Sequence, residues 1–304
     1  MNILITGGTG LIGTRLSELL TERAHTVMHL SHSQPQENAK YKTFGWKPED
    51  REYDAEVFRT ADAIINLAGA GIADKRWTNK RKEEIVNSRV DSGDLIVKAL
   101  EETEHKVQAV VNASAIGWYG TDQTVAGKFT EKDPVAQDFL ALTCYQWEKS
   151  IEPVRELNIP LSVVRTGIVL AKNGGAYPKL TLPITFFAMP VFGTGNQTYS
   201  WIHIDDLCGI YIKLVEEKAD GVYNAVAPEP VTQEELLQTV KKVKRYTSFR
   251  LPVPKGIMRR LLGEMSDSLL TNTAVSADKI ISDGYRFKYP DIESAVRALE
   301  KSTD

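Results

Sequence analysis

The segment TGGTGLIG, from Thr6 to Gly13, constrains the fold of this chain more than any other feature of its sequence. A short apolar run (NILIT) precedes it, and an amphipathic helical pattern (LIGTRLSELLTER) begins inside it. In a turn between strand and helix, glycines allow the tight bend, the close approach of backbone N–H groups to a pyrophosphate and the packing of helix on strand. The helix N-terminus adds a partial positive charge. We therefore predict a dinucleotide site with contacts from Gly7, Thr9, Gly10, Leu11, Ile12 and Gly13.

Apolar, β-prone runs alternate with helical patterns over the first 170 residues. This alternation predicts a parallel sheet with helices on both faces, which is a Rossmann-type doubly wound α/β fold. The expected strands are 2–6, 26–30, 63–67, 107–114 and 161–170, and the expected helices are 11–23, 79–102 and 137–157.

Beyond Gly174 and Gly175 the pattern becomes irregular and richer in proline. A strand is expected at 199–203, followed by a helix that Asp205 or Asp206 would cap. Three more helices are expected in the tail, at TQEELLQTVKKV, KGIMRRLLGEM and SADKIISDG. We therefore predict a Rossmann domain over 1–170, to which 199–227 return, and a smaller C-terminal lobe formed by 171–198 and 228–304.

The end of the second predicted strand indicates which dinucleotide the site prefers. NAD-binding sites usually carry an acidic residue here, which binds the ribose hydroxyls. This chain reads Leu30-Ser31-His32-Ser33, with no acid before Glu37. The hydroxyl of Ser31 and the imidazole of His32 are donors that suit a 2′-phosphate. We therefore predict NADP(H), with NAD as the less favoured cofactor; a surface loop that never touches the cofactor is the alternative.

The charge balance argues against nucleic acid or a membrane as the partner. With 37 Lys and Arg against 40 Asp and Glu, the formal net charge is −3, which provides no basic field. No apolar run approaches the ~18 residues of a membrane span, and the start MNILITGGTG lacks a signal-peptide pattern. Cys144 and Cys208 have no metal-ligand spacing. We expect a cytoplasmic protein with a small-molecule substrate and no metal.

Together these motifs resemble those of the extended short-chain dehydrogenase/reductases, the superfamily of nucleotide-sugar epimerases and dehydratases. A closer likeness is to an atypical epimerase-like subfamily that is sometimes labelled a cell-division inhibitor, and it covers essentially the whole chain. The superfamily motifs are Thr6-Gly7-x-x-Gly10-x-x-Gly13, Asp62, Asn66-Leu67-Ala68-Gly69, Ala113-Ser114-Ala115, Val164-Arg165-Thr166-Gly167 and Trp201-Ile202-His203-Ile204-Asp205-Asp206. Those of the subfamily are Arg76-Trp77-Thr78, Ser88-Arg89, Ser114-Ala115-Ile116-Gly117-Trp118-Tyr119-Gly120, Trp147-Glu148, Phe192-Gly193-Thr194-Gly195, Leu251-Pro252-Val253-Pro254, Leu262-Gly263-Glu264 and Gly284-Tyr285-Arg286-Phe287.

The resemblance implies a Rossmann-type domain, bound NAD(P) and a C-terminal substrate lobe. In the superfamily, a serine or threonine after the fourth strand polarises the substrate oxygen, and Ser114 matches it. A tyrosine acts as general acid/base there, and a lysine one turn later lowers its pKa, because a free tyrosine titrates near ~10. The resemblance also implies cofactor contacts from Leu67, Ala68, Gly69, Arg89 and Arg165.

Tyr145 and Lys149 have the spacing of this tyrosine–lysine pair but not its register. A spacing of four places both groups on one helix face. Alignment on the acid–proline stretch that precedes the pair, and on the glutamate that follows it, puts Leu140 in the tyrosine column and Cys144 in the lysine column. Tyr145 then lies about one and a half turns too far along the helix. We interpret the pair as accidental and keep Tyr145 as a second-choice catalytic candidate.

Four further features are functional candidates, and three of them have two interpretations. Tyr119 follows Ser114 closely and is a candidate for proton transfer. Arg89 could neutralise a phosphate or carboxylate, or could pair with a nearby acid. The basic cluster within 75–82 could steer phosphate, although a solvated helix start is commoner because acids follow it directly. His203 could be catalytic, or it could be a buried histidine bonded to a neighbouring aspartate.

Two functions remain open from the sequence. The first is an NADP(H)-dependent oxidoreductase or epimerase, in which Ser114 holds the reacting oxygen and the proton passes through Tyr119, water or Tyr145. The second is a dinucleotide-binding sensor or scaffold whose C-terminal lobe binds a protein partner. The tyrosine missing from its column favours the second, whereas Ser114 and the complete glycine motif favour the first.

Overall fold

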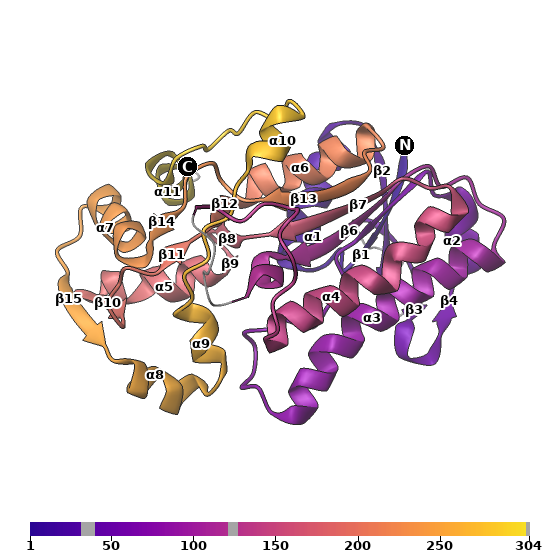
Figure 1. The fold of residues 1–304 in the computed structure, drawn as a ribbon. Helices are drawn as coiled ribbons and strands as arrows, with labels where there is room; N and C mark the ends of the chain where they lie inside the picture. The colour runs from indigo at the N-terminus through magenta and orange to yellow at the C-terminus, as the bar shows by residue number, and fades with distance from the viewer. Residues whose placement is uncertain (32–39, 121–126, 302–304) are drawn as a thin grey trace.

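A mostly parallel eight-stranded sheet forms the larger half of the molecule in the computed structural model, which describes residues 1–31, 40–120 and 127–301 (Figure 1). Its order is β13-β7-β6-β5-β1-β2-β3-β4, and β4 runs antiparallel to β3. This arrangement confirms the predicted Rossmann-type fold. The strands are β1 (Asn2–Thr6), β2 (Thr26–Ser31), β3 (Lys42–Lys47), β4 (Glu52–Tyr53), β5 (Ala63–Asn66), β6 (Val110–Ala115), β7 (Leu161–Thr166) and β13 (Gly221–Ala225).

Helices cover both faces of this sheet because its central strands are apolar on both sides. In β1, Ile3 and Ile5 belong to one hydrophobic cluster and Leu4 belongs to another, since successive side chains of a strand point to opposite faces. The first cluster is shared with α1 (Leu11–Glu22) and α6 (Ile204–Glu216), which pack on each other. The second face is covered by α2 (Ala55–Thr60), α3 (Asn79–Glu102) and α4 (Phe139–Ile151).

The helix predicted over 137–157 is shorter in the structure. It ends as α4 at Ile151, and a 3₁₀ helix, η3 (Glu152–Leu157), continues the chain. Pro153 explains the change, since it lacks the N–H that an α-helix requires and is tolerated at the first turn of a new helix. Two other 3₁₀ helices are η1 (Pro48–Asp50) and η2 (Ile116–Tyr119).

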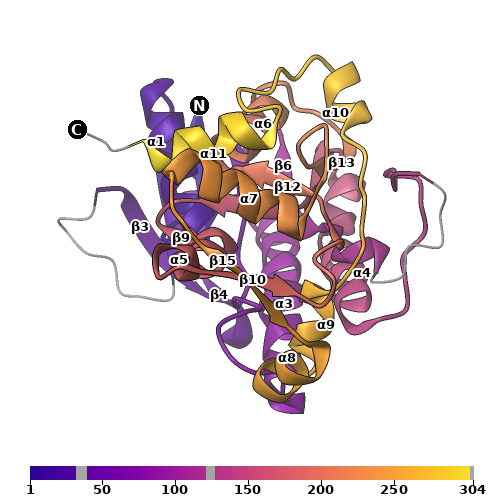
Figure 2. The ribbon, with the colours of Figure 1, turned by 90° about the vertical axis from the view of Figure 1, so that its left-hand side faces the viewer.

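The smaller lobe has its own hydrophobic cluster, which includes Trp201, Leu236 and Val296. Figure 2 shows α7 and α11 lying side by side above β15 and β10. Its strands form three short sheets, β12-β8-β9, β10-β15 and β11-β14. The remaining elements of the chain are β8 (Ile168–Ala171), β9 (Gly174–Gly175), α5 (Ala176–Thr185), β10 (Ala188–Phe192), β11 (Thr198–Tyr199), β12 (Trp201–His203), β14 (Val231–Thr232), α7 (Gln233–Lys244), β15 (Phe249–Val253), α8 (Lys255–Leu262), α9 (Met265–Leu269), α10 (Asp278–Ser282) and α11 (Ile292–Glu300).

The single strand predicted over 161–170 is divided between the two halves of the molecule. β7 pairs with β6 and β13 in the large sheet, whereas β8 pairs with β12 in the lobe. Gly167 lies at the break, where a Cβ atom would approach the carbonyl oxygen of Ser200 to 2.5 Å. The close crossing of a distant segment therefore requires glycine at this position, and the strand changes sheet there.

The tail of the chain is anchored to α6 through a buried carboxylate. Asp206 is 1% exposed and accepts hydrogen bonds from the backbone N–H groups of Lys288 and Tyr289 and from the hydroxyl of Tyr285. Burial nevertheless raises the pKa of Asp206, with these bonds opposing the rise. Ile280 and Tyr285 therefore pack on the first cluster of the large half, although both fall in the range predicted for the lobe.

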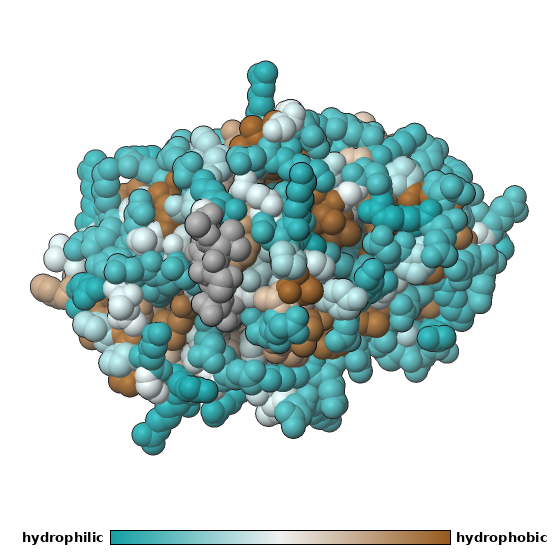
Figure 3. Space-filling view, viewed as in Figure 1, coloured by the Kyte–Doolittle hydropathy of each residue, from teal (hydrophilic) through white to brown (hydrophobic). Residues whose placement is uncertain are grey.

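The space-filling view shows apolar residues in patches among polar ones (Figure 3). Many exposed large apolar side chains of the lobe lie on α5, β15, α8 and the turn before β10, and they include Leu182, Phe186, Phe187, Phe249, Leu251, Ile257 and Leu261. No helix in the described part of the chain is long and apolar enough to cross a membrane.

Candidate functional site

The glycine loop joins β1 to α1 at the point where the strand order reverses, between β1 and β5. Gly7 has φ +65°, and a Cβ there would come 2.9 Å from the carbonyl oxygen of Leu67. The N–H of Gly10 donates to the carbonyl of Gly7 at 3.0 Å. A Cβ on Gly13 would come 2.4 Å from that same carbonyl oxygen. Gly7 and Gly13 are thus required by close backbone contacts, at the place where doubly wound sheets bind ligands.

A buried polar network holds the loop after β5 beside the glycine loop. The hydroxyl of Thr6 donates to the Oδ1 of Asn66 at 2.6 Å and accepts from the backbone N–H groups of Leu67 and Ala68, both at 3.0 Å. The Nδ2 of Asn66 donates to the Oδ1 of Asn112 on β6 at 2.7 Å. Side-chain hydrogen bonds therefore link the three adjacent strands β1, β5 and β6, and those of Thr6 set the position of Leu67 and Ala68.

The end of β2 carries Ser31, which pairs in register with Gly45 of β3. His32, the second residue predicted to contact a 2′-phosphate, lies outside the described residues. Two residues before Ser31 on β2, His29 is buried and its Nε2 lies 2.8 Å from the hydroxyl of Ser17. A Cβ on Gly8 would clash with this imidazole at 2.4 Å, so the second glycine of the motif makes room for His29.

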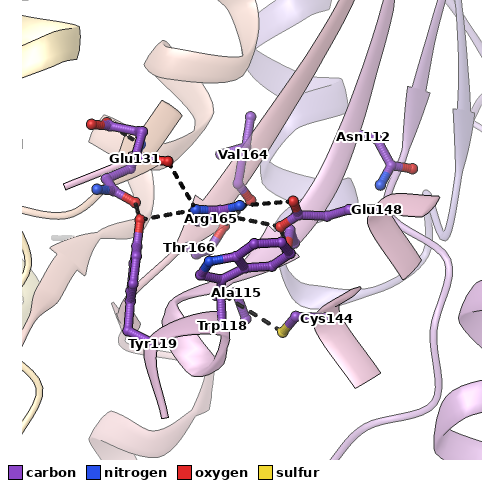
Figure 4. Close-up of polar contacts among 12 residues, drawn as sticks. Asn112, Ala115, Trp118, Tyr119, Glu131, Cys144, Glu148, Val164, Arg165 and Thr166 are labelled. Carbon is purple, nitrogen blue, oxygen red and sulfur yellow. Dashed lines mark hydrogen bonds and ion pairs between the residues drawn. The ribbon is translucent and has the colours of Figure 1, made fainter. Parts of the chain in front are cut away.

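Ser114, near the end of β6, belongs to a buried charge network. Figure 4 labels three other members of this network, which are Glu148, Arg165 and Tyr119. The hydroxyl of Ser114 donates to the Oε1 of Glu148 at 2.6 Å. The Nε and Nη2 atoms of Arg165 both donate to this carboxylate, each at 2.9 Å. The Nη1 of Arg165 also donates to the hydroxyl of Tyr119 at 3.2 Å, and that hydroxyl donates to Asn224 at 2.7 Å. Ser114, Tyr119 and Arg165 are therefore brought together.

The ring of Trp118 lies over the guanidinium of Arg165, 3.7 Å from the Cζ atom, as Figure 4 shows. Burial raises the pKa of Tyr119 to about 12, although Arg165 opposes the rise. A phenol with this pKa stays protonated near neutrality, and both of its hydrogen-bonding positions already have partners. This placement suits a positioning role for Tyr119 better than proton transfer.

The structure places Tyr145 and Lys149 on the exposed side of α4, where the Tyr145 side chain is 40% exposed. Leu140 and Cys144 lie on the side of α4 that faces η2. A Cβ on Gly117 would come 3.3 Å from the Cβ of Leu140 and 3.6 Å from the Sγ of Cys144. The thiol of Cys144 also lies 3.6 Å from the carbonyl oxygen of Ala115, next to Ser114.

Two other sets of candidate residues lie at the edge of the site. Within the basic cluster, Arg81 is buried and pairs with Glu84 at 2.7 Å, and Lys82 pairs with Glu264 of the smaller lobe at 2.6 Å. These two cations are thus used in internal contacts, one of which joins the halves of the molecule. Arg89 lies against Gly69, where a Cβ would meet its Cζ at 3.0 Å.

His203 caps α6, in place of the aspartates predicted for that role. Its Nδ1 accepts from the backbone N–H of Asp205 at 3.1 Å, and its ring lies 4.0 Å from that of Tyr289. The carboxylate of Asp205 forms an ion pair with Arg15 instead, with Oδ1 2.7 Å from the Nε atom of the arginine. Since His203 is 5% exposed, burial lowers its pKa to about 4.

The stability of the protein is expected to fall as the pH drops from 6.5 towards 4, because the unfolded chain then protonates His203 and the folded chain does not. This one group would lower the free energy of unfolding by about 1.4 kcal/mol for each pH unit in that window, and it would have no effect at higher pH. Urea unfolding of the wild type and of His203→Asn, which keeps a capping acceptor, measures the effect. The variant should show a shallower loss of stability; equal slopes would contradict the assignment.

Three residues of the network around Ser114 were not proposed as functional from the sequence: Glu148, Asn224 and Trp118. Glu148 and Trp118 belong to the subfamily motifs, so the sequence could have identified them as functional residues. Asn224 carried none, because it comes from β13, more than a hundred residues after Tyr119 along the chain. Among the described residues, no group of three or more His, Cys, Asp or Glu is arranged to hold a metal ion.

Comparison with known protein families and structures places this geometry in context. Residues 3–153 match the NAD dependent epimerase/dehydratase family, and residues 253–299 match a domain of unknown function, DUF1731. The chain is 34% identical to the epimerase family protein YfhF of Bacillus subtilis over 302 residues, which cover 98% of each chain.

Solved structures resemble the whole chain as well. The crystal structure of human epimerase family protein SDR39U1 with NADPH superposes with a TM-score of 0.86 at 28% identity, covering 98% of this chain and 99% of the human one. The UDP-glucose 4-epimerase of Thermus thermophilus in complex with NAD gives a TM-score of 0.79 at 18% identity over 98% of this chain and 97% of its own, which shows a shared fold alone.

Proposed function

Because the chain belongs to the NAD dependent epimerase/dehydratase family, we propose that it binds NADP(H) at the glycine loop and acts as an oxidoreductase or epimerase on a small polar substrate. The observation that carries the proposal is the glycine loop, in which Gly7 and Gly13 have no room for a side chain. Such a loop exposes backbone N–H groups at the start of α1, which suit a pyrophosphate.

The chain's own residues fit a dinucleotide at this position. Thr9, Gly10, Leu11 and Ile12 lie at the start of α1, and the loop of Leu67, Ala68 and Gly69 lies beside the glycine loop, where the hydroxyl of Thr6 binds the N–H groups of Leu67 and Ala68. A nicotinamide cofactor bound here would give or take a hydride. Ser31 at the end of β2 leaves the position of the usual ribose-binding acid without a carboxylate, which supports NADP(H) over NAD(H). The NADPH in the human relative's crystal structure supports the same preference.

Ser114 would hold the reacting oxygen of the substrate. Because its hydrogen is directed at Glu148, its oxygen presents lone pairs and can accept a hydrogen bond from a substrate hydroxyl. Arg165 holds the carboxylate of Glu148 in place. Arg165 also donates to the hydroxyl of Tyr119, which in turn donates to Asn224. These hydrogen bonds would therefore orient the Ser114 hydroxyl, and the buried residues that make them would not exchange protons with solvent.

Ser114→Ala is expected to lower kcat/KM for NADPH oxidation with a panel of carbonyl compounds by about 10²-fold, since a misplaced reacting group costs roughly that factor. Ser162→Ala is the matched control. Ser162 is a buried serine near the start of β7, far from the strand ends that form the site, and its hydroxyl donates to the carbonyl oxygen of Ala219. Turnover that survives Ser114→Ala unchanged would remove Ser114 from the mechanism.

The second candidate is a dinucleotide-binding sensor or scaffold. The specific observation in its favour is that Leu140 and Cys144 face η2, at the register where the resemblance implies a tyrosine and a lysine, while Tyr145 faces outward. The same assay separates the two functions. NADPH binding without turnover on any carbonyl, in the wild type and in Ser114→Ala alike, would favour the sensor.

A further inference from the structure

Arg89 extends from α3 towards the loop that follows β5. Its side chain covers Gly69, so that a Cβ there would lie 3.0 Å from Cζ and 3.3 Å from Nε. On its other side the guanidinium lies over the ring of Trp147, with Cζ 4.9 Å from the ring centre. Its Nη1 donates to the carbonyl oxygen of Ile85 at 2.8 Å. Gly69 and Trp147 therefore hold the guanidinium in one place.

The charge of Arg89 is not balanced within the described part of the chain. Arg165 and Arg81, the neighbouring buried arginines, pair with Glu148 and Glu84, whereas no described carboxylate lies within ion-pair distance of Arg89. Burial lowers the pKa of Arg89, and the charge of Arg81 lowers it further. A half-buried cation costs free energy unless an anion or hydrogen bonds compensate it.

The site of Arg89 adjoins that of Ser114 through α4: Trp147 lies under the guanidinium, and the next residue, Glu148, accepts from the Ser114 hydroxyl. Burial raises the pKa of Cys144 to about 12, and the nearby charge of Arg89 opposes that rise. The thiol of Cys144 in turn lies 3.6 Å from the carbonyl oxygen of Ala115, the residue after Ser114. Arg89 and Ser114 thus contact consecutive residues of α4, and Arg89 also lies against Gly69. Because the Ser114 hydroxyl already donates to Glu148, Arg89 supplies the free N–H donors there.

We propose that Arg89 binds the carboxylate or phosphate group of a ligand seated beside Ser114 and the Leu67–Gly69 loop, which makes a small anionic molecule the substrate class of this site. A guanidinium fork matches both anions with paired N–H donors. The assignment to a substrate rests on the proposed function, whereas anion binding by Arg89 does not. An anionic group of the cofactor offers the same chemistry, and the experiment separates the two sources.

The test uses inorganic phosphate and acetate as probes, acetamide as the neutral analogue of acetate, and titration calorimetry with and without saturating NADPH. Arg89→Gln is expected to weaken binding of at least one anion by about tenfold or more, the loss of one charge-assisted contact. Arg89→Lys, which keeps the charge, should retain part of the affinity and guards against misfolding of the glutamine variant. Lys98→Gln is the control, since Lys98 lies on the same helix and pairs with Glu102.

Anion binding that persists in NADPH-saturated protein and depends on Arg89 identifies a substrate site. Anion binding that NADPH abolishes, together with weaker NADPH binding by Arg89→Gln, identifies a cofactor anion as the ligand and overturns the substrate assignment. If Arg89→Gln binds phosphate, acetate and NADPH as the wild type does, Arg89 recognises no anion and the proposal is wrong. If the wild type binds an anion through Arg89 but no NADPH, the proposed function fails while the anion site stands.

Discussion

Replacing Arg165 with methionine is expected to lower the free energy of unfolding by about 3–5 kcal/mol, the usual cost of leaving one member of a buried ion pair alone. Arg165 is 2% exposed, and it supplies two hydrogen bonds to the carboxylate of Glu148 and one to the hydroxyl of Tyr119. Without it, Glu148 would retain the hydroxyl of Ser114 as a donor but no cation. Urea denaturation followed by circular dichroism measures the loss.

Two controls give this result its meaning. Arg297→Met removes an exposed arginine that pairs with Glu293 one helical turn away, and it should cost less than about 1 kcal/mol. The double variant Glu148→Leu/Arg165→Met removes both charges and should recover much of the loss, because no unpaired charge stays buried. A cost for Arg165→Met no larger than that for Arg297→Met would show that the pair contributes little to stability.

Gly13→Ala is expected to weaken NADPH binding by about 10²-fold or more, because it would displace the backbone N–H groups that are proposed to contact the pyrophosphate. The added Cβ would lie 2.4 Å from the carbonyl oxygen of Gly7 and 2.7 Å from the Cα of Gly8. Both are backbone atoms, so no side-chain rotation relieves the clash and the glycine loop must move. The N–H groups at the start of α1 would then lose the arrangement proposed for the pyrophosphate.

Gly45→Ala is the matched control for this prediction. Gly45 lies on β3, and a Cβ there meets nothing within 4 Å. It should therefore bind NADPH as the wild type does. Calorimetric titration gives the affinities, and thermal melting of both variants separates loss of binding from loss of folding. A Gly13→Ala protein that is folded and binds NADPH within about threefold of the wild type would contradict the proposed role of the loop.

Local patterns were enough to predict much of the fold. The helix expected over 79–102 is α3, Asn79–Glu102, and the first strand and the glycine loop lie where the sequence placed them. These elements depend on periodicity and on turn residues within a single segment. The tail was predicted less well. α11 (Ile292–Glu300) was not anticipated, and His203 caps α6 through a hydrogen bond that an aspartate was expected to make.

Side-chain networks were not predictable in this way, because their members come from different segments. Glu148 comes from α4, Arg165 from β7 and Asn224 from β13, and they meet only because β7 lies between β6 and β13 in the sheet. The roles expected for Ser114, Tyr119 and Tyr145 in catalysis stay predictions.

By itself, the sequence determined that a dinucleotide-type turn would join the first strand to the first helix, and that strands and helices would alternate into a doubly wound sheet. Both follow from short-range sterics and hydrophobic periodicity. Tertiary structure alone decided that the chain leaves the large sheet at Gly167, because the constraint is the carbonyl of Ser200, which lies between β11 and β12. It also decided that the charge of Arg165 is matched and that of Arg89 is not, since pairing depends on which distant carboxylates the fold brings within reach.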